Sequence, residues 1–251
     1  MVGKKLNWVP NLFTLGNLTL GFLAIVFALH GNSGENLQLA GSLIFLAALC
    51  DGVDGAAARL LKAGSELGAQ LDSLADLVTF GVAPAALAYV MVLRELDHVA
   101  FWPPGLPLGM AVAAIYPACA AYRLARFNIV HSSDSFAGLP SPIAGVIMAL
   151  LVFVHPGLLE LPLFLPGVVF LVMAFLMVST IRYGKPQVTF LRRFSRGRLV
   201  LVLTFVILCI LFLYLRYGPS HAAALLLTIA LVYVLTGLVA FVIHVIQIYR
   251  V

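Results

Sequence analysis

Charge is scarce in this sequence. Only 10% of its 251 residues are Asp, Glu, Lys or Arg, whereas 63% are hydrophobic, and the mean hydropathy is +1.09. Soluble globular domains carry about 25% charged residues, so the composition excludes that class. The net charge of +5 does not indicate a nucleic-acid partner, because basic loops of a membrane protein face anionic lipid headgroups. The sequence therefore predicts an all-α, polytopic membrane protein.

Cysteine and histidine are also too sparse to form a site. The three cysteines, Cys50, Cys119 and Cys209, lie far apart in apolar stretches and fit neither a disulfide framework nor a metal-binding spacing. We interpret them as small residues that pack between helices. The six histidines are scattered, so we assign them no chemistry. Residues 1–10 lead directly into an apolar segment, and no signal peptide is expected.

Apolar segments near the ~20 residues that a bilayer core requires recur eight times. We expect transmembrane helices at residues 11–29, 37–61, 67–93, 108–127, 142–154, 163–181, 199–215 and 222–248. Pro84 is expected to kink the third of them. The sequence has no internal repeat and no low-complexity tail, which predicts one integral membrane domain over residues 1–251.

The basic residues predict the orientation. If the N-terminus is cytoplasmic, thirteen of the fifteen Lys and Arg residues fall on the cytoplasmic side, and only Arg94 and Arg216 fall on the other. This asymmetry follows the positive-inside rule and agrees with an even number of spans. We therefore expect both termini in the cytoplasm and the turn between spans two and three at the cytoplasmic face of the cell (inner) membrane.

Acidic residues are rare but concentrated. Of the ten in the chain, five lie within residues 51–76: Asp51, Asp54, Glu66, Asp72 and Asp76. The pairs at 51/54 and 72/76 each place two carboxylates on one helical face. Between them, the segment KAGSE predicts a tight turn with Ser65 as a helix cap. Four carboxylates facing each other across this hairpin require cations, and oxygen ligands favour Mg²⁺, Mn²⁺ or Ca²⁺.

Small residues surround the aspartates, and their role has two possible interpretations. Small faces allow helices to pack closely in lipid. Alternatively, Gly55 and Ala58 leave room for a planar ligand, and Arg59, one turn further along, offers a fork of donors to phosphate.

These residues also form a specific signature. Asp51, Asp54, Gly55, Ala58, Arg59, Gly68, Asp72 and Asp76 match the pattern D-x2-D-G-x2-A-R-x8-G-x3-D-x3-D at every fixed position. The chain thus resembles the CDP-alcohol phosphotransferases. The resemblance implies a six-helix catalytic core, here residues 1–183, with residues 198–249 as an additional two-helix hairpin. It also implies two divalent cations held by the four aspartates, a nucleotide site that includes Gly55, Ala58, Arg59 and Gly68, and a homodimer.

Other segments resemble one branch of this family. PNLFTLGNLTLGFLAI (residues 10–25), DSLADLVTFGVAPA (72–85), YRLARFN (122–128) and GLPSP (138–142) are similar to bacterial and archaeal phosphatidylserine synthases. The implied reaction transfers the phosphatidyl group of CDP-diacylglycerol to the hydroxyl of L-serine and releases CMP.

Polar residues outside the signature complete the predicted site. Arg123 and Arg126, at i and i+3 near the cytoplasmic end of span four, are expected to hold the serine carboxylate and the donor diphosphate, together with Asn128. The alternative is that both arginines are positive-inside anchors. Asn11 and Thr14 are expected to contact nucleotide or phosphate, with helix capping as the equal alternative.

The predicted mechanism is a single displacement assisted by two metals, with Asp76 as the general base. Two other functions remain open at this stage. A related enzyme could use glycerol phosphate or inositol phosphate as the acceptor. A divalent-cation transporter could also carry aspartates, but spans four to eight contain no acidic residue that would continue a path across the membrane.

Overall fold

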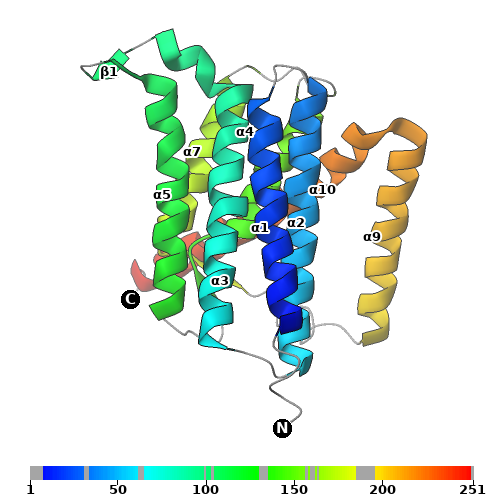
Figure 1. The fold of residues 1–251 in the computed structure, drawn as a ribbon. Helices are drawn as coiled ribbons and strands as arrows, with labels where there is room; N and C mark the ends of the chain where they lie inside the picture. Colours follow the sequence, from blue (N-terminus) through cyan, green and yellow to red (C-terminus); the bar gives the residue numbers. More distant parts are fainter. Residues whose placement is uncertain are drawn as a thin grey trace.

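The computed structural model describes residues 8–30, 34–61, 65–98, 100–102, 105–129, 135–155, 158, 162, 164–184 and 196–249. Within these residues, eight helical stretches follow the apolar segments of the sequence (Figure 1). The helices are α1 (Trp8–Leu29), α2 (Gly34–Leu61), the continuous stretch α3 (Glu66–Asp76), η2 (Leu77–Val82) and α4 (Ala83–Met91), then α5 (Leu108–Ile129), α6 (Ser141–Val154), α7 (Phe164–Val178), α9 (Arg196–Tyr217) and α10 (Pro219–Tyr249). Their bounds lie within a few residues of the predicted ones.

Five of these stretches, counted over the described residues, are long and apolar enough to cross a membrane: Asn11–Leu29, Gly34–Val53, Glu66–Met91, Leu108–Ile129 and Pro219–Gln247. Three shorter apolar helices accompany them: Ser141–Val154, Phe164–Val178 and Thr204–Tyr217. Large apolar side chains such as Phe205 and Leu215 point outward, 65% and 74% exposed, which a lipid environment explains. The prediction of an all-α polytopic membrane protein is confirmed, and the count of eight spans stays a prediction.

Two small antiparallel sheets interrupt the helices. β1 (Ala100–Trp102) pairs with β2 (Leu106–Pro107), after the short 3₁₀-helix η3 (Leu93–His98). β3 (Ser135–Ala137) pairs with β4 (Arg182–Gly184). The sequence analysis predicted neither sheet. The second one matters for the site, because it joins the start of α6 to the end of α7.

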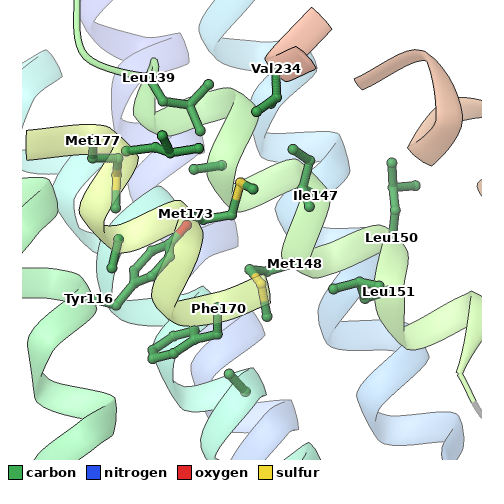
Figure 2. Close-up of a cluster of buried hydrophobic side chains, with 14 of the residues drawn as sticks. Tyr116, Leu139, Ile147, Met148, Leu150, Leu151, Phe170, Met173, Met177 and Val234 are labelled. Atoms are coloured by element: carbon green, nitrogen blue, oxygen red, sulfur yellow. The ribbon is translucent and has the colours of Figure 1, made fainter. Parts of the chain in front are cut away.

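The main core lies between α4, α5, α6, α7 and α10. Figure 2 shows Tyr116 of α5 beside Phe170 of α7, and their rings stack with centroids 4.8 Å apart. Met148 and Met173 lie in the same cluster between α6 and α7. A second cluster joins α1, α2, α4 and α6 and contains many alanines, which allow close helix contact in a membrane.

The stretch that carries Asp72 and Asp76 is irregular. Pro84 has no N–H to bond to the carbonyl four residues before it, and Ala83 donates to Val78 O, five residues back. Residues 77–82 therefore form a π-helical turn directly before Ala83 and Pro84, and the kink predicted at Pro84 stays a prediction. A Cβ at Gly21 of α1 would collide with Thr79, so α1 lies directly against this turn.

The last two helices are arranged differently from the others. In Figure 1, α9 stands apart from the bundle, whereas α10 passes behind it and ends near the level where α5 ends. α10 packs against α9, α6 and β4. The three cysteines lie on α2, α5 and α9, each partly buried.

Candidate metal centre and active site

Three carboxylates meet at one end of the bundle. Asp51 comes from α2, Asp72 and Asp76 come from α3, and one oxygen of each lies within 4.8 Å of the others. Asp76 is the most buried, at 8% exposed, and the other two are partly buried. The structure thus brings together three of the four predicted metal ligands. The side chain of the fourth, Asp54, lies outside the described residues.

The start of α3 fixes this arrangement. Ser65 caps the helix, as predicted, because its hydroxyl accepts a hydrogen bond from the Gly68 N–H at 3.0 Å. Asp72 and Asp76 then lie one turn apart on the same helical face. α1 packs against both α2 and α3, so the two helices that bear the carboxylates share this neighbour.

The donor set suits a hard cation. A Mg²⁺ ion binds oxygen at about 2.0–2.1 Å and a Ca²⁺ ion at about 2.3–2.6 Å, so the oxygens around one ion lie at most about 4 Å apart for Mg²⁺ and at most about 5 Å apart for Ca²⁺. The three carboxylate oxygens, within 4.8 Å of one another, satisfy the limit for Ca²⁺ and would have to move closer by about half an ångström to surround one Mg²⁺ ion. Three negative charges in a poorly solvated place are costly without a cation. Asp51, Asp72 and Asp76 could therefore hold a divalent metal ion.

Part of the predicted nucleotide site also comes together. A Cβ at Gly68 would lie 3.2 Å from Oδ1 of Asn11, so these residues from α1 and α3 are neighbours. Thr14 is buried one turn further along α1. Gly55 lies on α2, partly buried. The side chains of Ala58 and Arg59 lie outside the part of the chain that the structure describes.

Asn17 is a site residue that the sequence analysis missed. Its side chain is fully buried, and its Nδ2 donates to Asp76 Oδ1 at 3.4 Å. Thr79 donates from its hydroxyl to the backbone carbonyl of Asn17 at 3.0 Å, which links the π-helical turn to α1. A signal was present, because Asn11, Thr14 and Asn17 recur every three residues on a mainly apolar helix. Asn17 orients the carboxylate of Asp76.

Arg123 of α5 is buried within electrostatic range of Asp76, and its predicted contact with substrate stays a prediction. The side chain is 6% exposed, its Nη1 donates to the hydroxyl of Ser141 at 2.7 Å, and its guanidinium lies over the Phe127 ring at 5.9 Å from the centroid. Its charge interacts with that of Asp76. Nε has no hydrogen-bond partner among the described residues. A buried guanidinium with an unused N–H is suited to bind an anionic group.

Arg126 is held differently. Its guanidinium donates to the backbone carbonyls of Ala137, Met177, Val178 and Ser179, at 2.6 to 3.3 Å. Three of these carbonyls lie at the C-terminal end of α7 or just after it, where the helix itself provides no donors. The bonds favour a structural role for Arg126 over the predicted contact with substrate.

Asn128 also contacts the protein. Its Nδ2 donates to the hydroxyl of Ser73 at 3.0 Å, on α3 beside Asp72. This contact ties α5 to the helix that bears two of the carboxylates.

We expect Arg126→Ala to lower stability more than activity. The change leaves several partly buried carbonyls without a donor, at a cost of about 2–4 kcal/mol. Thermal unfolding in detergent should show a midpoint several degrees below that of the wild type. Arg182→Ala removes an exposed arginine from the adjacent strand and serves as the control. An unchanged midpoint together with a raised KM for a substrate would instead support the predicted binding role.

The fold and the site define the class of protein: a polytopic membrane protein with a cluster of carboxylates that could hold a metal ion. Residues 7–182 match the family described as CDP-alcohol phosphatidyltransferase, which is more than half of the chain. The protein belongs to this family, and the resemblance identified from the aspartate signature is confirmed.

Several relatives carry the name CDP-diacylglycerol–serine O-phosphatidyltransferase. The protein of that name from Bacillus subtilis is 39% identical over 155 residues, 61% of this chain and 80% of the relative. The one from Helicobacter pylori is 39% identical over 183 residues, 69% of this chain and 70% of the relative. The one from Methanocaldococcus jannaschii is 29% identical over 242 residues, 95% of this chain and 96% of the relative. The last match is long enough to include most of α9 and α10.

Proposed function

We propose that this protein is a phosphatidylserine synthase, which transfers the phosphatidyl group of CDP-diacylglycerol to the hydroxyl of L-serine and releases CMP. The observation that carries the proposal is the meeting of Asp51, Asp72 and Asp76, one of which, Asp76, interacts electrostatically with the buried Arg123. In a family of phosphatidyl-transferring enzymes, this arrangement offers a metal-binding group for a diphosphate and a cation for an acidic acceptor. The names of the relatives from three distant organisms support serine as that acceptor.

Two divalent cations are expected from the family resemblance, and they would be held by Asp51, Asp54, Asp72 and Asp76. Mg²⁺ or Mn²⁺ is the expected ion, and Ca²⁺ is compatible with the same oxygen ligands. Bound cations would neutralise the charge of the diphosphate and stabilise CMP as the leaving group. Asp76 accepts the proton of the serine hydroxyl as that oxygen bonds to the phosphorus attached to diacylglycerol. The bond from this phosphorus to the CMP oxygen then breaks.

Other residues of the chain position the two substrates. Arg123 binds the serine carboxylate through its unpartnered Nε–H. The neighbouring Asn11 and Gly68 contact the nucleotide or its phosphates, together with Thr14, Gly55, Ala58 and Arg59. Asn17 keeps the Asp76 carboxylate oriented while the proton moves.

We place the active site at the cytoplasmic face of the cell (inner) membrane. Eight spans with both termini in the cytoplasm agree with the excess of Lys and Arg on that side. In Figure 1, α1 begins and α10 ends toward the same end of the bundle. Residues 1–183 would form the catalytic core and residues 198–249 an additional hairpin within a single domain. A homodimer is expected from the family resemblance.

An acceptor screen tests this function. Purified protein in mixed micelles with CDP-diacylglycerol and Mn²⁺ or Mg²⁺ receives radiolabelled L-serine, glycerol 3-phosphate or inositol phosphate. We expect a labelled lipid and equimolar CMP with L-serine alone, and no product after chelation with EDTA. Labelled lipid formed from another acceptor would keep the family mechanism but overturn serine. No CMP release with any acceptor would overturn the enzymatic function.

A further inference from the structure

Hydrogen bonds join α1 to Asp76 and to the π-helical turn that follows it. In Figure 1, α1 runs beside the continuous stretch of α3, η2 and α4. Thr79 of η2 is fully buried, and its hydroxyl donates to the backbone carbonyl of Asn17 at 3.0 Å. Asn17 donates from Nδ2 to Asp76 Oδ1 at 3.4 Å. Asn17 is therefore held by the turn through its backbone and contacts the carboxylate with its side chain.

Gly21 makes the approach of Thr79 possible. In a regular α-helix the carbonyl of residue 17 is bonded to the N–H of residue 21, one turn later, so the Thr79 hydroxyl reaches this carbonyl beside Gly21. A Cβ at Gly21 would collide with that hydroxyl and would lie only 2.8 Å from the Cα of Thr79. Any larger residue at this position would push η2 away from α1. The hydrogen bond between Thr79 and Asn17 thus requires glycine at position 21.

The amide of Asn17 depends on this backbone contact for its position. The side chain is fully buried, but its Oδ1 has no hydrogen-bond partner among the described residues. The amide is therefore held only through Nδ2, and the bond of 3.4 Å to Asp76 is long for an N–H···O hydrogen bond. A small shift of α1 would break this bond. The backbone of Asn17, and hence Thr79, determines whether the amide reaches Asp76.

We propose that Thr79 and Gly21 are positioning residues of the reaction, which hold Asn17 where its amide orients the carboxylate of Asp76. The inference rests on the proposed function, in which Asp76 accepts the proton of the acceptor hydroxyl. A base is effective only within about 2.6–3.2 Å of the group from which it takes the proton, so its orientation affects the transfer step. Gly21 and Thr79 are themselves buried and do not bind substrate.

Thr79→Val tests the inference, because it removes the hydroxyl and keeps the shape of the side chain. We expect kcat to fall about tenfold or more at saturating divalent cation, since a misplacement of about 1 Å costs up to about a hundredfold in rate. The KM values for L-serine and CDP-diacylglycerol should stay at the wild-type level. Thr79→Ser keeps the hydroxyl and should retain most of the kcat. Thr19→Val removes a hydroxyl that bonds within α1 itself and is the matched control.

Gly21→Ala makes the same test from the other helix. The added methyl group should separate Thr79 from the carbonyl of Asn17 and lower kcat without a change in either KM. Gly16→Ala is the matched control, because a Cβ at Gly16 of the same helix would meet nothing within 4 Å. The kcat of Gly21→Ala decides the question if Thr79→Val does not yield folded protein.

A double-mutant cycle distinguishes positioning from packing. Asn17→Ala removes the amide but keeps the backbone carbonyl to which Thr79 donates. Because Thr79 acts through the amide, Thr79→Val should lower kcat no further in the Asn17→Ala background, whereas independent effects would multiply. Thermal midpoints of all variants report the loss of stability separately.

The other outcomes are distinct. With an active wild type, an unchanged kcat in Thr79→Val or effects that multiply in the cycle would overturn this inference and leave the proposed function intact. A raised KM for either substrate with an unchanged kcat would overturn it as well, because the contact would then serve binding. Absence of serine-dependent CMP release by the wild type would overturn the proposed function and this inference with it.

Discussion

Asp76→Asn should reduce turnover about a thousandfold or more while CDP-diacylglycerol still binds. Asparagine has nearly the same shape and retains an oxygen for a cation, but it cannot accept the proton of serine. The loss of a general base costs about 10²–10⁴ in rate, and a weaker metal ligand adds to it. Asp76 is the most buried of the three described carboxylates and the one that Asn17 orients, which is why we assign it this role.

The measurement has two parts. CMP release with saturating L-serine reports turnover. The rise in thermal midpoint on adding CDP-diacylglycerol reports donor binding, because a ligand that binds the folded state stabilises it. Glu66→Gln removes an exposed carboxylate from the first turn of the same helix and should leave both values at the wild-type level. Full turnover in Asp76→Asn would remove Asp76 from the role of base.

Arg123→Lys should raise the KM for L-serine about a hundredfold, with a much smaller change in kcat. Lysine keeps the positive charge but lacks the planar fork that donates to a carboxylate and to Ser141 at the same time. Truncation of one partner of a buried, hydrogen-bonded charge pair costs about 2–5 kcal/mol, which corresponds to roughly 30-fold or more in affinity.

Steady-state kinetics with each substrate varied in turn decides this prediction. Arg94→Lys, at an exposed position in η3, is the matched control and should behave as the wild type. A raised KM for CDP-diacylglycerol with an unchanged KM for serine would reassign Arg123 to the diphosphate. If neither KM changed, Arg123 would be better interpreted as a residue that anchors the cytoplasmic end of α5 under the positive-inside rule.

The sequence was sufficient for the helices and for the carboxylates because both depend on local patterns. Apolar segments of fixed length predict helix bounds regardless of how the helices pack. Asp72 and Asp76 share a face because they are four residues apart in one helix. Asp51 meets them because α2 ends at Leu61 and α3 begins at Glu66, so the two helices that bear the carboxylates are adjacent in the sequence.

The functions of the other polar residues depend on contacts that no local pattern encodes. Asn17 points to Asp76 because α1 lies closely against the π-helical turn at Gly21, a matter of helix packing. Arg126 binds the end of α7 because β3 and β4, which are more than forty residues apart in the chain, pair beside it. Tyr183 follows the sixth apolar segment, where hydropathy predicts a loop, and only the fold brings its ring onto Gly237 of α10.

The π-helical turn after Asp76 contains one residue more than a regular turn would need. Since each residue of an α-helix advances by about 100°, every side chain from Ala83 onward is rotated by that amount relative to Asp72 and Asp76. The aspartate signature ends at Asp76, before this turn, so the signature residues alone do not specify the rotation. A designer who grafted the eight signature residues onto two ideal helices would copy the ligands, yet would orient the membrane-embedded half of the third span toward the wrong neighbours.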